Sequence, residues 1–332
     1  MPTVNRQIQL AGIPTDKLGP EHFRLAQAPM PQAGDGELLV RVMLISLDAA
    51  NRAWMQGATY RSALEAGQVM AGGALAEVVE AKAPGFSPGD LVFADTGWQE
   101  YAAIAAKRAQ KLERREPLTH LLSVYGVAGL TAYFGLLRVG QPKAGETVVV
   151  SAAAGSVGAF VGQIAKIKGC RVIGIAGGAR KCAWLKSELG FDAAIDYKAG
   201  ALPAALKEAA PKGVDVYFDN VGGDILEACL FRMNLGGRIA CCGAVSQYDG
   251  APPRHGPRGI PGLIVTKRLT MQGFLLYDFE SERQGALDEL EGWVNSGQLK
   301  VPEDVIAGLE NTPAALIGLL AGENIGKRMV RL

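Results

Sequence analysis

The stretch ETVVVSAAAGSVGAFVGQIAKIKGCRVIGIAGGARK, residues 146–181, decides the fold of this chain. Residues 147–150 are a β-branched run that is too apolar to face water on either side, which predicts a buried parallel strand. Small residues follow, and apolar residues then recur at helical spacing over residues 159–168. Residues 171–176 form a second apolar run. The stretch therefore predicts one unit of strand, tight turn, helix and strand.

The turn of this unit predicts a dinucleotide site. Small residues at such a turn let backbone N–H groups and the positive end of the helix approach a pyrophosphate. Against the pattern G-x-G-x-x-G the chain has Ala153, Gly155 and Gly158, so alanine replaces the first glycine. The alternative is a turn that is only well packed. The cofactor-binding residues predicted here are Ala154, Gly155, Ser156, Val157 and Gly158.

The end of the second strand indicates which dinucleotide binds. An NAD site usually has an Asp or Glu about 20 residues past the glycines, where it accepts a hydrogen bond from the ribose 2′-OH. That place holds Gly177, Arg180 and Lys181, and the next acidic residue along the chain is Glu188. Cations at the start of a helix oppose its dipole unless an anion binds there. The 2′-phosphate of NADPH would be that anion, and two solvated surface cations are the alternative.

Composition bounds the class of protein. The chain has 332 residues, enough for two domains, and its 43 glycines and 48% hydrophobic content are typical of a soluble α/β enzyme. A net charge of +1 argues against nucleic acid or a membrane surface as a partner. No uninterrupted apolar stretch reaches about 18 residues, and residues 1–10 lack a signal-peptide core. We therefore expect a cytoplasmic protein whose substrate is a small molecule.

Cysteine and histidine usage predicts no metal site. The five cysteines have no disulfide-framework spacing, and only three histidines are present. A zinc site needs three or four well-spaced ligands, and no such cluster is visible in the sequence. Cys241 and Cys242 would point to opposite faces of a strand, which is poor geometry for binding one ion.

The first third of the chain predicts a β-rich region. Residues 37–47, 73–81 and 90–94 read as strands separated by Gly and Pro, so residues 1–124 are expected to form an antiparallel, partly closed barrel. The segment between the first two strands is a plausible substrate-facing segment, because loops on a rigid sheet tend to carry function. A surface helix followed by a loop is the alternative. The substrate residues predicted there are Asn51, Arg52 and Tyr60.

The rest of the chain predicts a Rossmann domain. Six buried strands alternate with helices, which fits two βαβ halves of one doubly wound sheet. Ligand contacts should come from the carboxyl ends of its strands. The predicted strands cover residues 147–150, 171–176, 193–195, 214–218, 238–242 and 270–274. From the strand ends we predict Asn220, Gly243, Val245, Phe274 and Leu275 as cofactor-binding residues and Tyr277 as a substrate residue.

Three later segments complete the predicted organisation. The Pro/Gly-rich residues 250–262 are too long for a hairpin and could form a lid or a subunit contact. Amphipathic helices are expected near residues 284–295 and 313–320. Residues 327–332 read as a short strand that returns to the first domain.

Several motifs together resemble a known family. They are LDAANRAWM at residues 47–55, GxxGxTAY at 126–133, AAAGSVGAFVGQIAKIKGC at 152–170, DNVGG at 219–223, CCGAVSQY at 241–248 and ENIGKRMV at 323–330. The chain resembles the zinc-independent medium-chain dehydrogenases/reductases, in the branch of prostaglandin, alkenal double-bond and curcumin reductases. The resemblance implies a GroES-like domain, residues 1–124 and 295–332, with a Rossmann domain, residues 125–294, inserted.

The resemblance also implies a cofactor and an assembly. The family uses NADPH, with Lys181 and Tyr197 at the 2′-phosphate and Asn324 near the phosphates or the nicotinamide ribose. Thr131 in the GxxGxTAY motif belongs to the same implied cofactor site. The family usually forms homodimers.

The implied reaction is hydride transfer to the β-carbon of an α,β-unsaturated aldehyde or ketone, which produces an enolate. The enolate needs a hydrogen-bond donor, and a phenol stays protonated at neutral pH. Tyr248, at the family's SxY position, and Tyr60 are the two candidates for the catalytic donor. The family often has tyrosine and arginine where this chain reads Ala50, Asn51 and Arg52, so its substrate preference can differ. Quinone reduction and NADPH binding without turnover are the alternative functions.

Overall fold

The unit predicted at residues 146–181 is the centre of a six-stranded parallel sheet. The computed structural model describes residues 3–58, 61–250 and 256–332. Strand β8 (Thr147–Ser151) leads into helix α3 (Ser156–Ile167) and then into β9 (Arg171–Ala176), which pairs with β8 in parallel. All five β8 residues are buried. This burial on both faces explains why the strand has no polar alternation.

The order of the strands confirms a doubly wound Rossmann sheet. The strands lie in the order β10, β9, β8, β11, β12 and β13, so the sequence order of the strands reverses between β8 and β11, which are parallel to each other. The remaining strands are β10 (Ala193–Asp196), β11 (Val214–Asp219), β12 (Met233–Cys241) and β13 (Thr270–Gly273). Strand β12 begins at Met233 rather than at the predicted Arg238, because Gly236 and Gly237 interrupt the apolar pattern without ending the strand.

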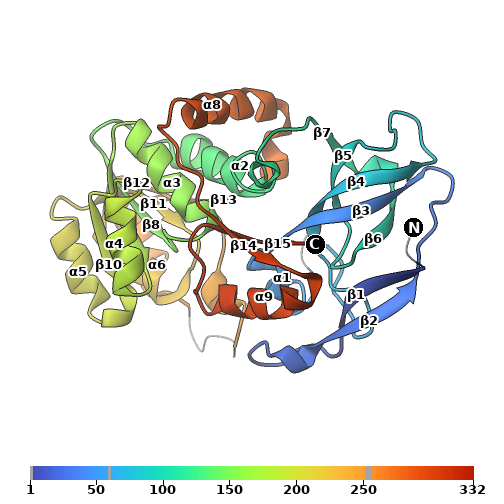
Figure 1. Ribbon diagram of the computed structural model, residues 1–332. Helices are drawn as coiled ribbons and strands as arrows, with labels where there is room; N and C mark the ends of the chain where they lie inside the picture. Colours follow the sequence, from blue (N-terminus) through green and yellow to red (C-terminus); the bar gives the residue numbers. More distant parts are fainter. Residues whose placement is uncertain (1–2, 59–60, 251–255) are drawn as a thin grey trace.

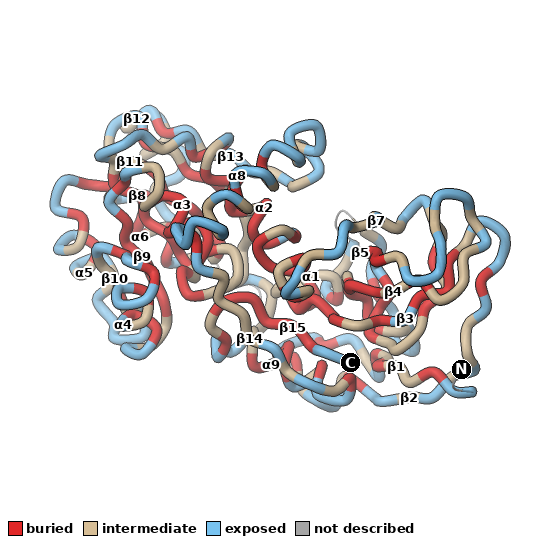
Figure 2. The backbone as a smooth tube through the Cα atoms, turned by 45° about the horizontal axis from the view of Figure 1, so that its top comes forward, coloured by how far each residue is buried: buried red, intermediate tan, exposed pale blue. Residues whose placement is uncertain are grey.

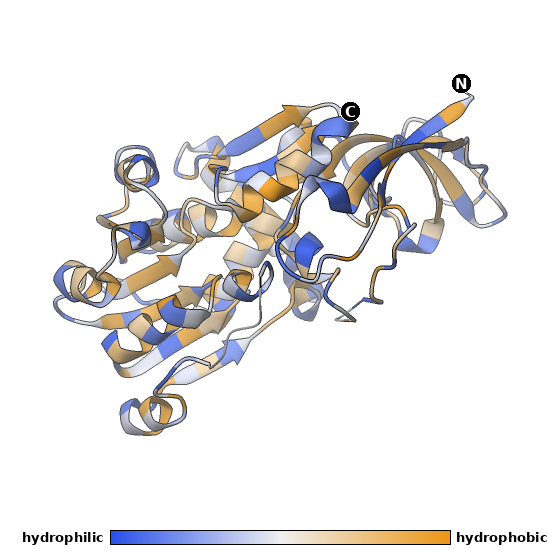
Figure 3. Ribbon diagram, turned by 90° about the horizontal axis from the view of Figure 1, so that it is seen from below, coloured by the Kyte–Doolittle hydropathy of each residue, from blue (hydrophilic) through white to orange (hydrophobic). Residues whose placement is uncertain are grey.

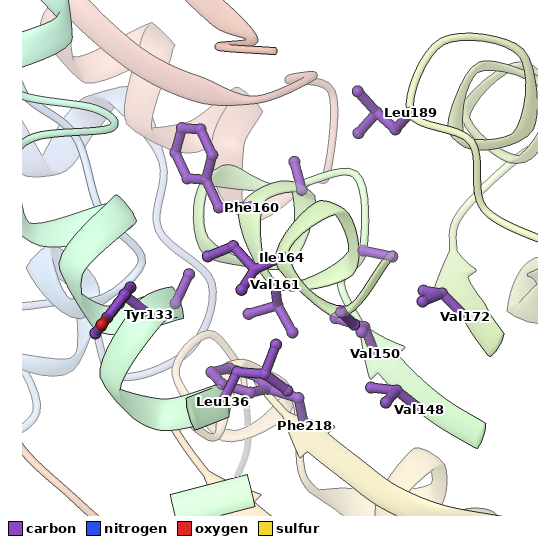
Figure 4. Close-up of a cluster of buried hydrophobic side chains, with 14 of the residues drawn as sticks. Tyr133, Leu136, Val148, Val150, Phe160, Val161, Ile164, Val172, Leu189 and Phe218 are labelled. Atoms are coloured by element: carbon purple, nitrogen blue, oxygen red, sulfur yellow. The ribbon is translucent and has the colours of Figure 1, made fainter. Parts of the chain in front are cut away.

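Helices cover both faces of this sheet (Figure 1). Helices α2 (Val127–Phe134), α3, α4 (Ala179–Ser187) and α8 (Arg283–Asn295) pack on one face, and α5 (Leu202–Ala209), α6 (Gly223–Arg232) and α7 (Gly262–Lys267) pack on the other. Figure 4 shows Phe160, Val161 and Ile164 of α3 above Val150 and Val148. Burying a side chain of this size contributes roughly 1.5–3 kcal/mol, so this packing fixes α3 and the turn before it.

The first domain, predicted from the first third of the chain, is rich in antiparallel strands. Its sheet runs β14, β15, β3, β4, β5 and β7, and β6 also pairs with β3. The bounds are β3 (Glu37–Ser46), β4 (Gly73–Ala81), β5 (Leu91–Asp95), β6 (Tyr101–Ala105), β7 (Gln110–Leu112), β14 (Glu303–Ala307) and β15 (Lys327–Arg331). A separate pair is formed by β1 (Val4–Leu10) and β2 (Phe23–Pro29). Figure 2 shows buried backbone in the middle of both sheets.

The end of the chain returns to the first domain, as predicted. Strand β15 pairs antiparallel with β3, and β14 pairs with β15. Helix α9 (Thr312–Leu320) connects these two strands and packs against β15. Figure 1 shows this dark red segment running between the two domains. Figure 3 shows that the sheet strands are largely hydrophobic, whereas polar residues are frequent on the helices around them.

Part of the Pro/Gly-rich stretch 250–262 lies outside the described residues, as does Tyr60. The described end of that stretch packs on its own domain, since Arg258 Nη2 lies 2.7 Å from a Glu227 carboxylate oxygen of α6. It then leads into α7. A lid or a subunit contact at residues 250–262 stays a prediction.

Candidate functional site

The turn between β8 and α3 has the geometry of a pyrophosphate site. A Cβ atom on Gly158 would lie 2.4 Å from the carbonyl oxygen of Ala152, so only glycine fits there. Gly155 is the extended residue that precedes α3, and within the described residues no side chain caps this helix. The first N–H groups of the helix are therefore available to an anion. The backbone is left-handed at Ala152 (φ +47°) rather than at Ala153, the residue that the glycine pattern picks out.

The segment before β15 lies against this turn. Gly326 N–H donates to the carbonyl oxygen of Ala154 at 2.8 Å. Asn324 is buried, and its Nδ2 donates to the Gly326 carbonyl at 2.9 Å. The structure thus brings Asn324 to the predicted phosphate turn, although the two are far apart in the sequence.

The predicted 2′-phosphate residues gather at the carboxyl ends of β9 and β10. A Cβ atom on Gly177 would lie 3.1 Å from the Tyr197 ring and 2.9 Å from Lys198 Cε, so both side chains lie over this glycine. Lys181 is buried, and its Nζ donates to the carbonyl oxygen of Gly322 at 2.7 Å. Arg180 is exposed on the same helix, α4.

Like charges accumulate at this point. The pKa of Lys181 is lowered, first by burial and then by the neighbouring cations Arg180, Lys198 and Arg328. Grouped cations of this kind are costly unless an anion neutralises them. Perturbed groups of this kind are candidates for a binding site.

Two residues at this site are absent from the sequence prediction. Lys198 is one, and Asp196, the last residue of β10, is the other. The Asp196 carboxylate accepts the N–H groups of Gly178 at 2.8 Å and Lys198 at 2.9 Å. It thereby holds the β9 and β10 ends together. Sheet pairing would have revealed it, because Asp196 is the partner of Ala176 at the end of β9.

The carboxyl ends of β8 and β11 meet where the strand order reverses. Asn220 Nδ2 donates to the Ser151 carbonyl at 2.7 Å. The buried Asp219 carboxylate accepts from Tyr217 Oη at 2.7 Å and from the N–H groups of Val221 and Gly222. This network fixes the DNVGG turn at the crevice where Rossmann domains bind ligands.

The turn that follows β12 packs against the DNVGG turn. Gly243 N–H donates to the Asp219 carbonyl, and Val245 N–H donates to the Asn220 carbonyl. The Oη atom of Tyr248 accepts the N–H of Ala244 at 3.0 Å. The described residues provide no acceptor for its hydroxyl hydrogen, so Tyr248 is available as a donor. The second tyrosine candidate, Tyr60, lies outside the described residues.

The two polar residues predicted to face the substrate are bonded inside the protein. Both belong to helix α1 (Ala50–Ala53) and are buried. Asn51 Oδ1 accepts the N–H of Asp48, and its Nδ2 donates to the Ala71 carbonyl. Arg52 Nε donates to an Asp249 carboxylate oxygen at 2.9 Å. Substrate contact by Asn51 and Arg52 stays a prediction.

The residues predicted after β13 lie in different environments. The Phe274 ring packs in the core, 6.3 Å from the Phe218 ring, so its backbone is the part that could face a cofactor. Leu275 is 45% exposed and Tyr277 is 73% exposed. Thr131 is half-buried on α2. Their roles stay predictions.

The cysteines behave as structural residues. Cys241 packs with the core on one face of the sheet and Cys242 with the core on the other. Burial raises the pKa of the Cys241 thiol to about 11 and that of Cys242 to about 12. Among the described residues, no three His, Cys, Asp or Glu side chains lie close enough together to hold a metal ion. The described helices also include none that could span a bilayer.

Comparison with known proteins identifies relatives along the whole chain. Two family profiles match, the N-terminal domain of oxidoreductase over residues 6–112 and zinc-binding dehydrogenase over residues 156–292. Prostaglandin reductase 1 of Bos taurus is 44% identical, covering 96% of this chain and 95% of its own. NADPH-dependent curcumin reductase of Escherichia coli is 41% identical, with 99% and 97% covered.

Solved structures agree with these relatives. The crystal structure of CurA from Vibrio vulnificus in complex with NADPH has a TM-score of 0.93 at 40% identity and covers 98% of both chains. Quinone oxidoreductases match at 23–24% identity, which shows a shared fold alone. The chain therefore belongs to the medium-chain dehydrogenase/reductase family, in the branch that contains curcumin reductase, prostaglandin reductase 1 and 2-alkenal reductase.

Proposed function

We propose that this protein is an NADPH-dependent reductase of the carbon–carbon double bond of α,β-unsaturated ketones and aldehydes. The observation that carries the proposal is its similarity, over nearly its whole length, to reductases named for NADPH and for such substrates. The site is consistent with this function. The β8–α3 turn, the cation cluster (Arg180, Lys181 and Lys198) and Tyr248 all follow the carboxyl ends of strands of the parallel sheet.

The residues of this chain fit NADPH. When bound, NADPH supplies the hydride. The β8–α3 turn, residues 154–158, binds the pyrophosphate, and Arg180, Lys181 and Tyr197 bind the 2′-phosphate beside Gly177. Lys198 joins them, since its side chain lies over the same glycine. The nicotinamide half is held by residues at the other strand ends and by the segment before β15: Thr131, Asn220, Gly243, Val245, Phe274, Leu275 and Asn324.

The substrate side of the site supplies a hydrogen-bond donor. Hydride transfer to the β-carbon leaves an enolate, whose oxygen needs that donor and whose α-carbon takes up a proton from solvent to give the saturated product. Tyr248 is the donor that we favour, because its oxygen is held by the Ala244 N–H and its hydrogen is free to donate. Tyr60 is the alternative donor. Asn51, Arg52, Tyr60 and Tyr277 are proposed to shape the substrate pocket.

The function is tested by following the absorbance of NADPH with a panel of enones, quinones and simple ketones, with NADH in parallel. We expect enones to be reduced to saturated ketones and NADPH to be preferred. Hydroquinone as the main product would replace the proposal with quinone reduction. Tight NADPH binding without any turnover would instead indicate a non-catalytic NADPH-binding protein.

We also propose a homodimer in the cytoplasm, with the GroES-like domain formed by residues 1–124 and 295–332 and the Rossmann domain by residues 125–294. The open edge of β13 supports the dimer, because it ends the parallel sheet. Exposed apolar side chains on two neighbouring elements, Leu235 of β12 and Val265 of α7, support it too.

A further inference from the structure

The turn that carries Tyr248 is held by the other domain. Gln56 Nε2 donates to the backbone carbonyls of Gln247 and Tyr248, at 3.1 and 3.0 Å. The Asp249 carboxylate accepts the N–H of Leu18 at 2.8 Å and Arg52 Nε at 2.9 Å. Three consecutive residues of the Rossmann domain thus bind three separate residues of the GroES-like domain.

The ion pair in this contact is buried on its basic side. The Arg52 side chain is 1% exposed and that of Asp249 is 21% exposed. Arg52 Nη2 donates to the Asp16 carbonyl at 2.6 Å, and Nη1 is buried with no hydrogen-bond partner in the described part of the chain. Asp249 is therefore the carboxylate that pairs with the buried guanidinium of Arg52. This pairing holds Asp249 in one position, because leaving the buried charge of Arg52 unpaired is costly.

We propose that Asp249 is a positioning residue, which fixes the Tyr248 turn against α1 and residues 16–18 and so sets the place of the tyrosine hydroxyl. The inference rests on the proposed function, in which Tyr248 donates to the enolate. Its geometric basis is direct: Asp249 follows Tyr248, and the Tyr248 carbonyl itself accepts a hydrogen bond from Gln56 of the other domain. A displaced donor is costly, since a shift of about 1 Å can reduce the rate roughly 100-fold.

The test compares three variants of the full-length enzyme. Asp249→Ala removes the carboxylate, Asp249→Asn keeps an oxygen acceptor of the same shape, and Gln56→Ala removes the second attachment without touching the buried ion pair. We expect Asp249→Ala to lower kcat for an enone by about tenfold or more, with the KM for NADPH within about twofold. Asp249→Asn should recover most of this loss. Gln56→Ala tests the same positioning role if Asp249→Ala does not fold. It should lower kcat by about threefold to tenfold.

A double mutant separates positioning from general stability. In a Tyr248→Phe background the donor is already gone, so Asp249→Ala should add little further loss. Hydrogen exchange in the NADPH complex gives a readout besides activity: the amide of Leu18 and the backbone of residues 247–249 should exchange faster in Asp249→Ala than in the wild type. Glu291→Ala is the matched control, because it breaks an ion pair between the two domains, with Arg115 at 2.8 Å, on different elements. It should leave kcat unchanged.

The outcomes are distinguishable. Full activity of Tyr248→Phe would overturn the proposed role of that tyrosine and the positioning role with it. If Tyr248→Phe is inactive while Asp249→Ala and Gln56→Ala are both fully active, only the positioning role is overturned. Equal losses from Asp249→Ala in both backgrounds would also overturn it.

Discussion

At the scale of single residues, the cation cluster predicts cofactor preference. Replacing Arg180 and Lys181 together by glutamine should raise the KM for NADPH about tenfold to 100-fold, because a hydrogen bond to a charged group contributes roughly 1.5–3 kcal/mol. The KM for NADH, which has no 2′-phosphate, should stay within about twofold. Steady-state kinetics with both cofactors measures this. Lys186→Gln, exposed on the same helix, is the control, and equal effects on both cofactors would contradict the assignment.

Lys181 also predicts a pH dependence. Its pKa is lowered from the ordinary value of 10.5, chiefly by burial, so it loses its proton at a lower pH than an exposed lysine does. In the proposed site the 2′-phosphate would bind the protonated form of Lys181. The Kd for NADPH should therefore rise as the pH increases toward 10.5, whereas the Kd for NADH should change less. Titrations of NADPH fluorescence across this range test it, and Lys181→Arg should flatten the curve, because arginine stays charged. Identical pH profiles for both cofactors would refute it.

The sequence predicts single residues best where chemistry is local to one turn. Gly158 follows from the glycine pattern, and its close approach to Ala152 is what the pattern implies. Tyr197 and Asn324 come from the family resemblance, because nothing in their local sequence marks them. Lys198 and Asp196 are missing from the prediction, since they reach the site only through the pairing of β10 with β9. Asn51 and Arg52 are predicted to face the substrate, and contacts distant in sequence engage their polar groups.

At the scale of elements, the junction of β8 and α3 predicts a stability difference between glycines. Gly158→Ala would place a methyl group 2.4 Å from a backbone oxygen, so the turn must shift. We expect the free energy of unfolding to fall by about 1–3 kcal/mol and NADPH binding to weaken. Denaturant titration and cofactor binding measure both. Gly292→Ala in α8, where nothing lies within 4 Å, is the control and should raise stability by about 0.5–1 kcal/mol. Unchanged stability of Gly158→Ala would contradict the assigned close packing.

Element bounds follow from periodicity where a strand is buried and uninterrupted. Strands β8 and β9 match their predictions closely, because their apolar runs have clear ends. The start of β12 does not, since glycines and the exposed Leu235 hide its first half. Helix α2, which carries the GxxGxTAY motif, continues into a π-helical stretch, Gly135–Gly140. Periodicity detects the helix there but not its change of pitch.

At the scale of the whole molecule, the return of the chain ties the two domains together. Lys327 is 1% exposed, and its Nζ donates to the Leu47 carbonyl and to Asp48. Its neighbour Gly326 donates a hydrogen bond to the β8–α3 turn, so one short segment contacts both that turn and the residues that precede α1. The sequence predicts the short strand β15 itself. Its pairing with β3 depends on burial between residues far apart in the sequence, which a local pattern does not predict.

The open edge of the parallel sheet predicts the assembly. Two copies that join their β13 edges are proposed also to cover exposed apolar side chains of the neighbouring elements, Leu235 of β12 (64% exposed) and Val265 of α7 (71% exposed). Light scattering should then give twice the monomer mass. The double variant Leu235→Asp with Val265→Asp should be monomeric. Burying unpaired carboxylates in an interface costs roughly several kcal/mol, whereas both positions stay in water in the monomer. Leu25→Asp, at a 50% exposed position on β2 of the other domain, should stay dimeric. A monomeric wild type, or a double variant that stays dimeric, would exclude this edge as the interface.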